Sequence, residues 1–117
     1  MTDNEGISAP RPLEPDDEVA SFQSGVDSLD HWLRKRALAN QVSGASRTYV
    51  IRGGGRVVGY FALAAGAIGQ REATGGVRRN MPEPIPVMVL ARLAVDKDHQ
   101  GLGLGSALLR DALLRAV

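Results

Sequence analysis

The chain has 117 residues and a net charge of +1. This length is enough for one domain with a hydrophobic core, and nothing in the sequence indicates a second domain. It contains no cysteine, so disulfides, zinc–thiolate sites and thiol nucleophiles are excluded. The longest apolar stretches are too short or too interrupted to span a bilayer, and the first residues lack a signal-peptide pattern, so we expect a cytoplasmic protein.

The charge is distributed unevenly along the chain. Residues 1–30 hold eight acids and one base, whereas residues 31–117 hold thirteen bases and five acids. A basic body suits a phosphate-rich ligand such as a nucleotide cofactor or an RNA, although a solvated basic surface is an equally good interpretation of charge alone.

The first half of the chain predicts a leader followed by a helix. Residues 1–14 are polar, contain proline and lack periodicity, so we expect a mobile leader with the folded domain at 15–117. Residues 26–41 predict one helix, which Asp27 can cap. Its apolar face should dock on a sheet and consists of Leu29, Trp32, Leu33 and Ala37.

The middle of the chain predicts strands. Residues 47–68 contain two β-rich runs separated by three glycines, which indicates an antiparallel hairpin. Residues 69–86 are rich in glycine and proline and predict an exposed loop. The run from Val87 to Val95 is almost wholly apolar, as in a strand buried on both faces, and Arg92 is its one interruption.

The last stretch predicts a helix that follows a glycine-rich loop. Residues 105–117 repeat apolar side chains at helical spacing, with Leu104, Leu108 and Ala112 on one side and Leu109, Leu113 and Ala116 beside them. Glycines at 101, 103 and 105 let the backbone approach a ligand, and free N–H groups at a helix start bind phosphate.

The spacing of these glycines selects one kind of anion loop. The pattern G-x-G-x-x-G fails at Ser106, and no P-loop sequence occurs. The pattern Q-x-x-G-x-G, filled by Gln100, Gly103 and Gly105 after an LAV strand end and before SALL, resembles the pyrophosphate loop of the GNAT superfamily of N-acetyltransferases. The alternative is a glycine-rich strand-to-helix turn without a ligand.

The resemblance implies an α/β GNAT acyl-CoA N-acyltransferase fold, a central, mostly antiparallel sheet flanked by helices, with acetyl-CoA as cosubstrate and no metal. It implies that the strand backbone holds the pantetheine arm, that the loop holds the pyrophosphate, and that a strand N–H could polarise the thioester carbonyl. By position, the implied cofactor-binding residues are Leu93, Ala94, Val95, Gln100, Gly101, Leu102, Gly103, Leu104, Gly105 and Ser106.

A closer resemblance covers nearly the whole chain. The segments SGVDSLDHWL, SGASRTYV, GRVVGYFALAAGAI, RRNMPEPIPVMVLARLAVD and QGLGLGSALLRDAL are similar to the GNAT toxins of bacterial toxin–antitoxin systems. This similarity implies acetylation of the amino acid on charged tRNA, which blocks translation, and a ribbon-helix-helix antitoxin as partner.

The acceptor chemistry is consistent with that implication. An α-amino group with a pKa near ~8 is partly neutral in the cell, so it needs little help from a general base. No convincing base is present: His99 adjoins the loop and is expected to be structural or phosphate-facing, and His31 is expected on a helix surface. The candidates for RNA contacts are Arg34, Lys35, Arg36, Arg78, Arg79 and Arg92. For each of them, a solvated or carboxylate-paired arginine or lysine is an equal alternative.

The sequence departs from the family at its end. The chain stops at Val117, inside the helix after the loop, whereas family members continue through another strand, helix and hairpin and supply a tyrosine that protonates the CoA thiolate. No residue here matches that tyrosine, so we nominate no catalytic residue. A strand edge left open predicts weak cofactor binding and self-association, for example as a homodimer. Two other functions stay open: an acetyltransferase for a small amine or a protein N-terminus, and an inactive module that binds an antitoxin.

Overall fold

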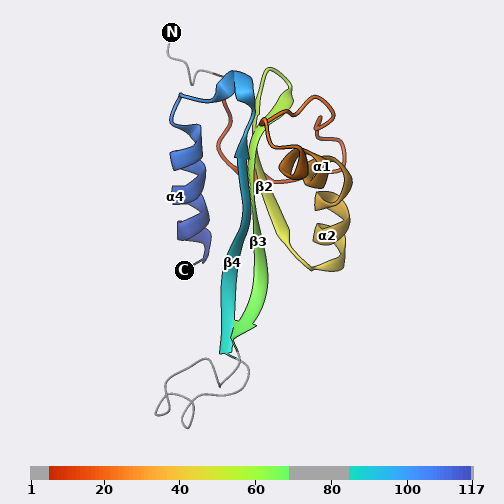
Figure 1. Ribbon diagram of the computed structural model, residues 1–117, viewed down its shortest axis with the longest axis vertical. Helices are drawn as coiled ribbons and strands as arrows, with labels where there is room; N and C mark the ends of the chain where they lie inside the picture. The colour runs from red at the N-terminus through yellow and green to blue at the C-terminus, as the bar shows by residue number, and fades with distance from the viewer. Residues whose placement is uncertain (1–5, 69–84, 117) are drawn as a thin grey trace.

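The computed structural model describes residues 6–68 and 85–116. Its centre is an antiparallel sheet in the order β1-β2-β3-β4, formed by β1 (Arg11–Pro12), β2 (Arg47–Gly53), β3 (Arg56–Ile68) and β4 (Ile85–Val95). Helices α1 (Asp27–Lys35) and α2 (Ala37–Ser43) cover one face, and α4 (Leu104–Ala116) covers the other (Figure 1). The predicted antiparallel sheet with flanking helices is therefore confirmed.

The β2–β3 hairpin forms where the glycines predicted it. Gly54 and Gly55 make its tight turn with φ values of +61° and +80°, a backbone region that glycine enters at little cost. The strands pair from Arg47 with Leu63 to Gly53 with Arg56. The predicted loop of residues 69–86 lies outside the described residues, except that Ile85 and Pro86 already belong to β4.

The predicted single helix is two helices. Arg36 has a φ of −123°, which ends α1 and lets α2 begin at Ala37. The prediction that Asp27 caps the helix is wrong, because Val26 occupies that position and Asp27 is the first helical residue. The entry to α1 is tied down instead by Asp30, whose carboxylate accepts from the N–H and hydroxyl of Ser24.

Part of the expected leader is ordered and packed. β1 pairs with β2, the N–H of Ser8 donates to the carbonyl of Arg52, and the side chain of Leu13 is buried in the core. Arg11 forms an ion pair with Asp17 beyond β1. A short edge strand needs only two residues of pairing and one apolar anchor, a signal too short for periodicity to detect.

Each face of the sheet has its own core. The α1–α2 side buries Phe22, Trp32, Leu33 and Ala37 against Tyr60, among others. The α4 side is packed by the predicted helix face together with the sheet residues opposite it: Ile51, Val58, Phe61, Leu63, Leu104, Leu108 and Ala112. The apolar spacing thus predicted the buried residues Trp32, Leu33, Ala37, Leu104, Leu108 and Ala112, whereas the neighbouring row of Leu109, Leu113 and Ala116 is exposed.

Strand β4 is not buried on both faces, contrary to the sequence prediction. Met88, Val89 and Leu90 are 48%, 44% and 38% exposed. The strand pairs only with β3 in the described sheet, and it extends with β3 beyond the helices (Figure 1). On the α1 side, side chains of the helices cover only the end of β4 near Ala94. The apolar run therefore belongs to an edge strand whose first half is not covered by a helix. No helix in the described parts of the chain is long and apolar enough to cross a membrane.

Candidate cofactor site and acceptor face

The glycine loop joins β4 to α4 through a short 3-10 turn, η2 (Lys97–His99). Gly101 and Gly103 have φ values of +83° and +81°, so both positions favour glycine. The N–H of Ala107 makes the first bond of α4, to the carbonyl of Gly103 at 3.1 Å. The N–H groups of 104–106 therefore have no acceptor within the helix and can bind an anion.

A hollow of about 270 Å³ lies at this helix start. Its walls are Val95, His99, Gln100, Gly101, Gly103, Leu104, Gly105 and Ser106. The structure thus gathers most of the predicted pyrophosphate-binding residues around one open space. Leu102 does not line this hollow and packs on the α4-side core instead.

Gly105 is not explained by packing inside the protein. A Cβ at this position would meet only the side chain of Val95, at an ordinary 3.9 Å. A glycine inside a helix costs about 0.5–1 kcal/mol relative to alanine. Because the fold itself would accept alanine here, the bare backbone is available for close approach by a ligand.

Gln100, one of the predicted cofactor-binding residues, lines the hollow and also connects the loop to the rest of the protein. Its side-chain amide donates to the carbonyls of Ser24 and Val95, each at 2.9 Å. The side chain therefore ties the loop to the end of β4 and to the segment before α1. With its side-chain amide engaged in this way, Gln100 has its backbone N–H to offer to the predicted anion.

Asp96 is the buried anchor of the same turn and was missed as such by the sequence analysis. Its carboxylate accepts from the guanidinium of Arg56 at 3.1 and 3.2 Å and from the N–H groups of Gln23 and Asp98. Burial would raise the pKa of Asp96, but these donors outweigh burial and hold the pKa at about 2. Asp96 is thus a fixed anion and no general base. Two of these partners, Arg56 and Gln23, lie 40 and 73 residues away along the chain, so no local pattern reveals them.

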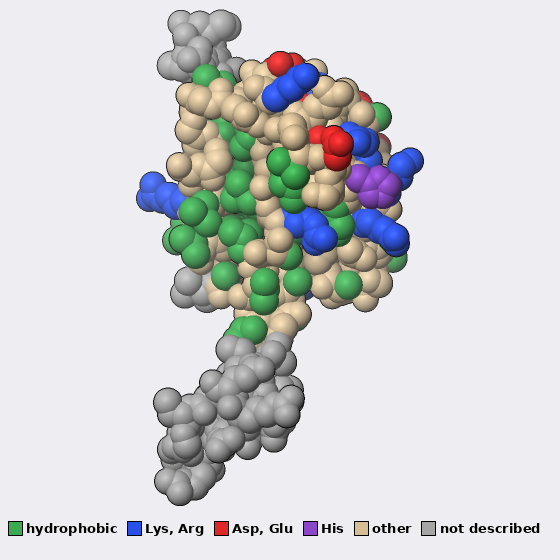
Figure 2. All heavy atoms as spheres, in the orientation of Figure 1, with side chains coloured by type: hydrophobic (Ala, Val, Ile, Leu, Met, Phe, Trp, Pro, Cys, Tyr) green, Lys and Arg blue, Asp and Glu red, His purple; other side chains and the backbone are tan. Residues whose placement is uncertain are grey.

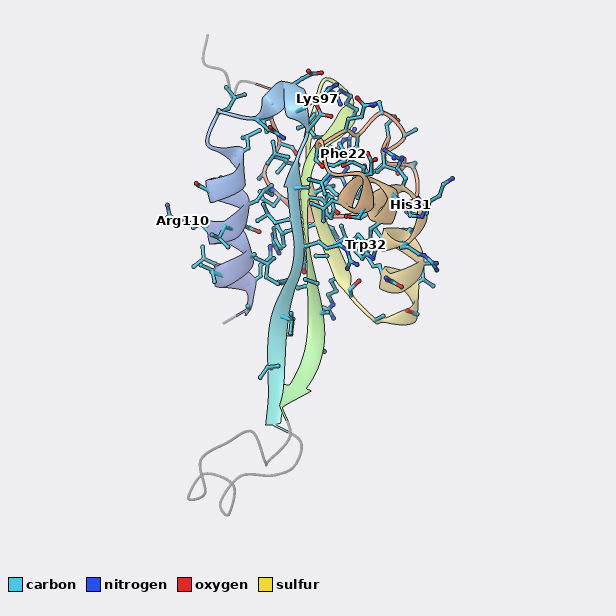
Figure 3. The ribbon with its side chains drawn as sticks, in the orientation of Figure 1. Phe22, His31, Trp32, Lys97 and Arg110 are labelled. Atoms are coloured by element: carbon cyan, nitrogen blue, oxygen red, sulfur yellow. The ribbon has the colours of Figure 1, made fainter. Side chains whose placement is uncertain are left out.

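His99 lies at the rim of the hollow, as expected for a structural or phosphate-facing residue. Its Nδ1 is 3.5 Å from Asp96 Oδ2, a weak contact that orients the ring. His31 is exposed on α1, on the side of the sheet away from α4 (Figure 3).

The end of β4 supplies the open edge that a pantetheine arm would need. Ala94 pairs with Tyr60, and the N–H of Asp96 donates to the carbonyl of Val58. Because backbone groups alternate in an antiparallel ladder, those of Ala94 face β3, whereas those of Leu93 and Val95 face the open edge. A register irregularity at Ala91 precedes this segment.

The predicted basic residues do not act alike. Arg34 is tied to the carbonyl of Phe22 at 2.7 Å, whereas Lys35 and Arg36 are exposed. Arg92 forms no ion pair with a carboxylate among the described residues. It does not point freely into solvent either, because its guanidinium lies 4.4 Å from the centre of the Trp32 ring. Figure 2 shows basic and histidine side chains together on the viewed face where α1 lies beside β4. Arg78 and Arg79 lie outside the described residues.

Comparison with known proteins decides what this arrangement is. Residues 44–117, which include β2 to β4 and the glycine loop, match the family described as Acetyltransferase (GNAT) domain. The chain belongs to the GNAT acetyltransferase family. This confirms the predicted family and N-acetyltransferase class, and acetyl-CoA is the cosubstrate that the family uses.

This GNAT acetyltransferase is also similar to individual toxins. It is 59% identical over 112 residues to a protein of Mycobacterium tuberculosis (strain ATCC 25618 / H37Rv) named tRNA-acetylating toxin, with 96% of this chain and 68% of the relative covered. The chain therefore spans about two thirds of the length of that relative.

Solved structures show the same fold at lower identity. The Y145F mutant of KacT matches with a TM-score of 0.79 at 20% identity, over 95% of this chain and 69% of its own. AtaT complexed with acetyl-methionyl-tRNAfMet matches with a TM-score of 0.76 at 22% identity, over 93% and 68%. AtaTR bound with AcCoA matches with a TM-score of 0.78 at 21% identity, over 96% and 66%.

Proposed function

We propose that this acetyltransferase is a toxin that transfers acetyl from acetyl-CoA to the amino group of an amino acid carried by tRNA and so blocks translation. The observation that carries the proposal is the 59% identity to a tRNA-acetylating toxin. The open β4 edge, the anion hollow and the basic face beside α1 support it, because together they suit a CoA donor and an RNA acceptor.

The donor would lie along the end of β4 and over the glycine loop. Leu93 and Val95 present backbone groups to the open edge, and Gly101 and residues 103–106 line the hollow. A strand N–H directed at the thioester carbonyl would stabilise the negative charge that develops on its oxygen. Three further residues would support this site from inside the protein. Ala94 pairs with β3, the side chain of Gln100 bonds the loop to Ser24 and Val95, and Leu102 packs in the α4-side core.

The reaction needs a neutral amine. Its nitrogen forms a bond to the acetyl carbon and loses one proton, the carbon–sulfur bond of the thioester breaks, and the departing CoA thiolate gains one proton, so that the products are the amide and CoA. An α-amino group near pKa ~8 supplies enough neutral amine at cellular pH without a base from the protein. Asp96 could not act as such a base, because a carboxylate with a pKa of about 2 binds a proton too weakly to take one from an ammonium group.

The acceptor and the partner follow from the same proposal. Lys35, Arg36 and Arg92, together with Arg78 and Arg79, would contact the phosphates of tRNA in the cytoplasm. Arg34 would contribute through its tie to Phe22 rather than as a free cation. A ribbon-helix-helix antitoxin would neutralise the toxin.

Transfer of labelled acetyl from acetyl-CoA to bulk charged tRNA tests the proposal. We expect label on the amino acid, released together with it by mild alkali, and no transfer by Gly103→Glu, because a charged side chain at a positive φ blocks the anion loop. Uncharged tRNA serves as the negative control.

Two other outcomes would replace the proposal. Label on a small amine or a peptide N-terminus, unchanged after charge reversal at Lys35 and Arg36, would favour a different acetyltransferase. Capture of an antitoxin without any transfer would favour an inactive binding module.

A further inference from the structure

Arg92 is a partly buried cation for which the described residues supply no ion-pair partner. It lies partly buried on β4, in a run that is otherwise apolar, opposite Ala62 of β3. Within residues 6–68 and 85–116, every ion pair found involves other residues, so no described carboxylate neutralises it. A partly buried guanidinium without an anionic partner is costly, which suggests that the partner arrives from outside.

The guanidinium is nevertheless held in place by an aromatic column. It lies 4.4 Å from the centre of the Trp32 ring, and Trp32 stacks on Tyr60 at 5.9 Å with an interplanar angle of 15°. Tyr60 meets Phe22 edge-on and is fixed by a 2.7 Å bond from its hydroxyl to the carbonyl of Leu29. Figure 3 shows Phe22 and Trp32 between α1 and the sheet. Stacking on one side leaves the N–H edge of the guanidinium to bind a ligand.

The position of Arg92 relates it to the reacting atoms. It immediately precedes Leu93, whose backbone faces the open edge of β4, and it follows the irregularity at Ala91. Its side chain is on the α1 face of the sheet, where it lies over Trp32. An acceptor that reaches a thioester on this edge from the α1 face therefore passes the guanidinium.

We propose that Arg92, held on Trp32, is a specificity-determining residue that binds the terminal nucleotide of the acceptor through its phosphate. The inference rests on the proposed function and deepens it: the enzyme selects an amino acid esterified to RNA over a free amine by this contact. The planar guanidinium suits a phosphate because it donates two parallel hydrogen bonds, which a lysine ammonium cannot reproduce.

Direct binding tests the proposal without requiring turnover. The probe is a short oligonucleotide ending in CCA whose amino acid is joined by a stable amide, compared with the same amino acid amide lacking a nucleotide. We expect Arg92→Gln to weaken oligonucleotide binding on the order of 10- to 100-fold and Arg92→Lys to recover only part of that loss. The Kd for acetyl-CoA should not change. Arg110→Gln is the matched control, since Arg110 is exposed on α4, across the sheet from α1 (Figure 3).

Each result separates this inference from the proposed function. Equal binding by wild type and Arg92→Gln, or full recovery by lysine, would overturn the role of Arg92 even if charged tRNA is acetylated. A parallel loss of acetyl-CoA binding in Arg92→Gln would show a structural role and would also overturn it. If the wild type binds acetyl-CoA but acetylates no charged tRNA, the proposed function fails, and the binding comparison still decides whether Arg92 recognises a nucleotide.

Discussion

At the scale of single residues, the carboxylate of Asp96 lies beside the glycine loop but is fully engaged inside the protein. Arg56 and two backbone N–H groups occupy its oxygens, and its pKa of about 2 records that they favour the ionised form. The same ion pair joins β3 to the turn that begins the loop. The charge of Asp96 therefore shapes the cofactor site without taking part in proton transfer.

The lowered pKa of Asp96 predicts how stability depends on pH. The folded value of about 2 lies below the model-compound value of 3.8, so its contribution is complete above pH 4 and is lost as the pH falls toward 2. The difference corresponds to about 2 kcal/mol. Urea unfolding at pH 6 and pH 3 should show roughly half of this loss in the wild type, about 1 kcal/mol, because pH 3 still lies above the folded pKa.

Substitution of Asp96 isolates that contribution. Asp96→Asn should be destabilised at pH 6 and should lose less stability between pH 6 and pH 3 than the wild type. Asp98→Asn is the matched control. The Asp98 carboxylate is 73% exposed, and its 3.9 Å distance from the Arg56 guanidinium makes a weaker ion pair than that of Asp96. Equal pH dependence in the wild type and Asp96→Asn would contradict the assignment.

At the scale of elements, the start of α4 combines glycines that the fold requires with one that it does not. Gly103 has a positive φ, whereas Gly105 lies in the helix with room for a Cβ. Gln100 then fastens the whole loop to β4 and to the segment before α1. The loop is thus held open by contacts from two other elements before any cofactor binds.

The two glycines should respond in opposite ways to alanine. Gly103→Ala should lower the free energy of unfolding by about 1 kcal/mol, because a side chain is strained at positive φ. Gly105→Ala should raise it by about 0.5–1 kcal/mol, because alanine is the better helix former. Chemical unfolding of the cofactor-free variants measures both, and a destabilised Gly105→Ala would show that its backbone serves the fold.

Removal of the Gln100 amide should affect the site more than the fold. Gln100→Leu loses two exposed hydrogen bonds, so we expect acetyl-CoA affinity to fall about tenfold while unfolding changes by no more than about 1 kcal/mol. Calorimetric titration with acetyl-CoA measures the first quantity. Unchanged affinity would mean that the loop keeps its shape without this tie.

At the scale of the whole molecule, β4 pairs with β3 alone in the described sheet, and an apolar strip lies beside its other edge. Met88 and Leu90 lie on the α4 face of the strand, and Leu109 and Leu113 of α4 are 43% and 59% exposed. An exposed, apolar edge strand favours pairing with another chain. We therefore expect the chain to self-associate through this side of the molecule.

Substitution on this strip should reduce self-association. Leu90→Lys places a charge beside the free edge and should shift the 117-residue chain toward monomer in sedimentation velocity. Val42→Lys is the control, because Val42 is 83% exposed on α2, far from β4 in the fold. If both substitutions act alike, general solubility rather than the β4 edge governs association.

Local patterns in the sequence determined the elements of this protein. Three glycines placed the hairpin turn, helical spacing selected Leu104, Leu108 and Ala112 as buried, and Q-x-x-G-x-G located the hollow at the start of α4. Each of these features depends on residues that are close to one another in the sequence. Backbone preference and apolar periodicity act over that range, so they can be read before the chain is folded.

Only the tertiary structure decided what joins these elements. It broke the first helix at Arg36, attached part of the expected leader to the sheet, and left half of β4 uncovered. It also brought Arg56 to Asp96 and laid Arg92 over Trp32, pairs that are 40 and 60 residues apart. Such contacts depend on how sheet and helices pack in three dimensions, and no short stretch of sequence carries that information.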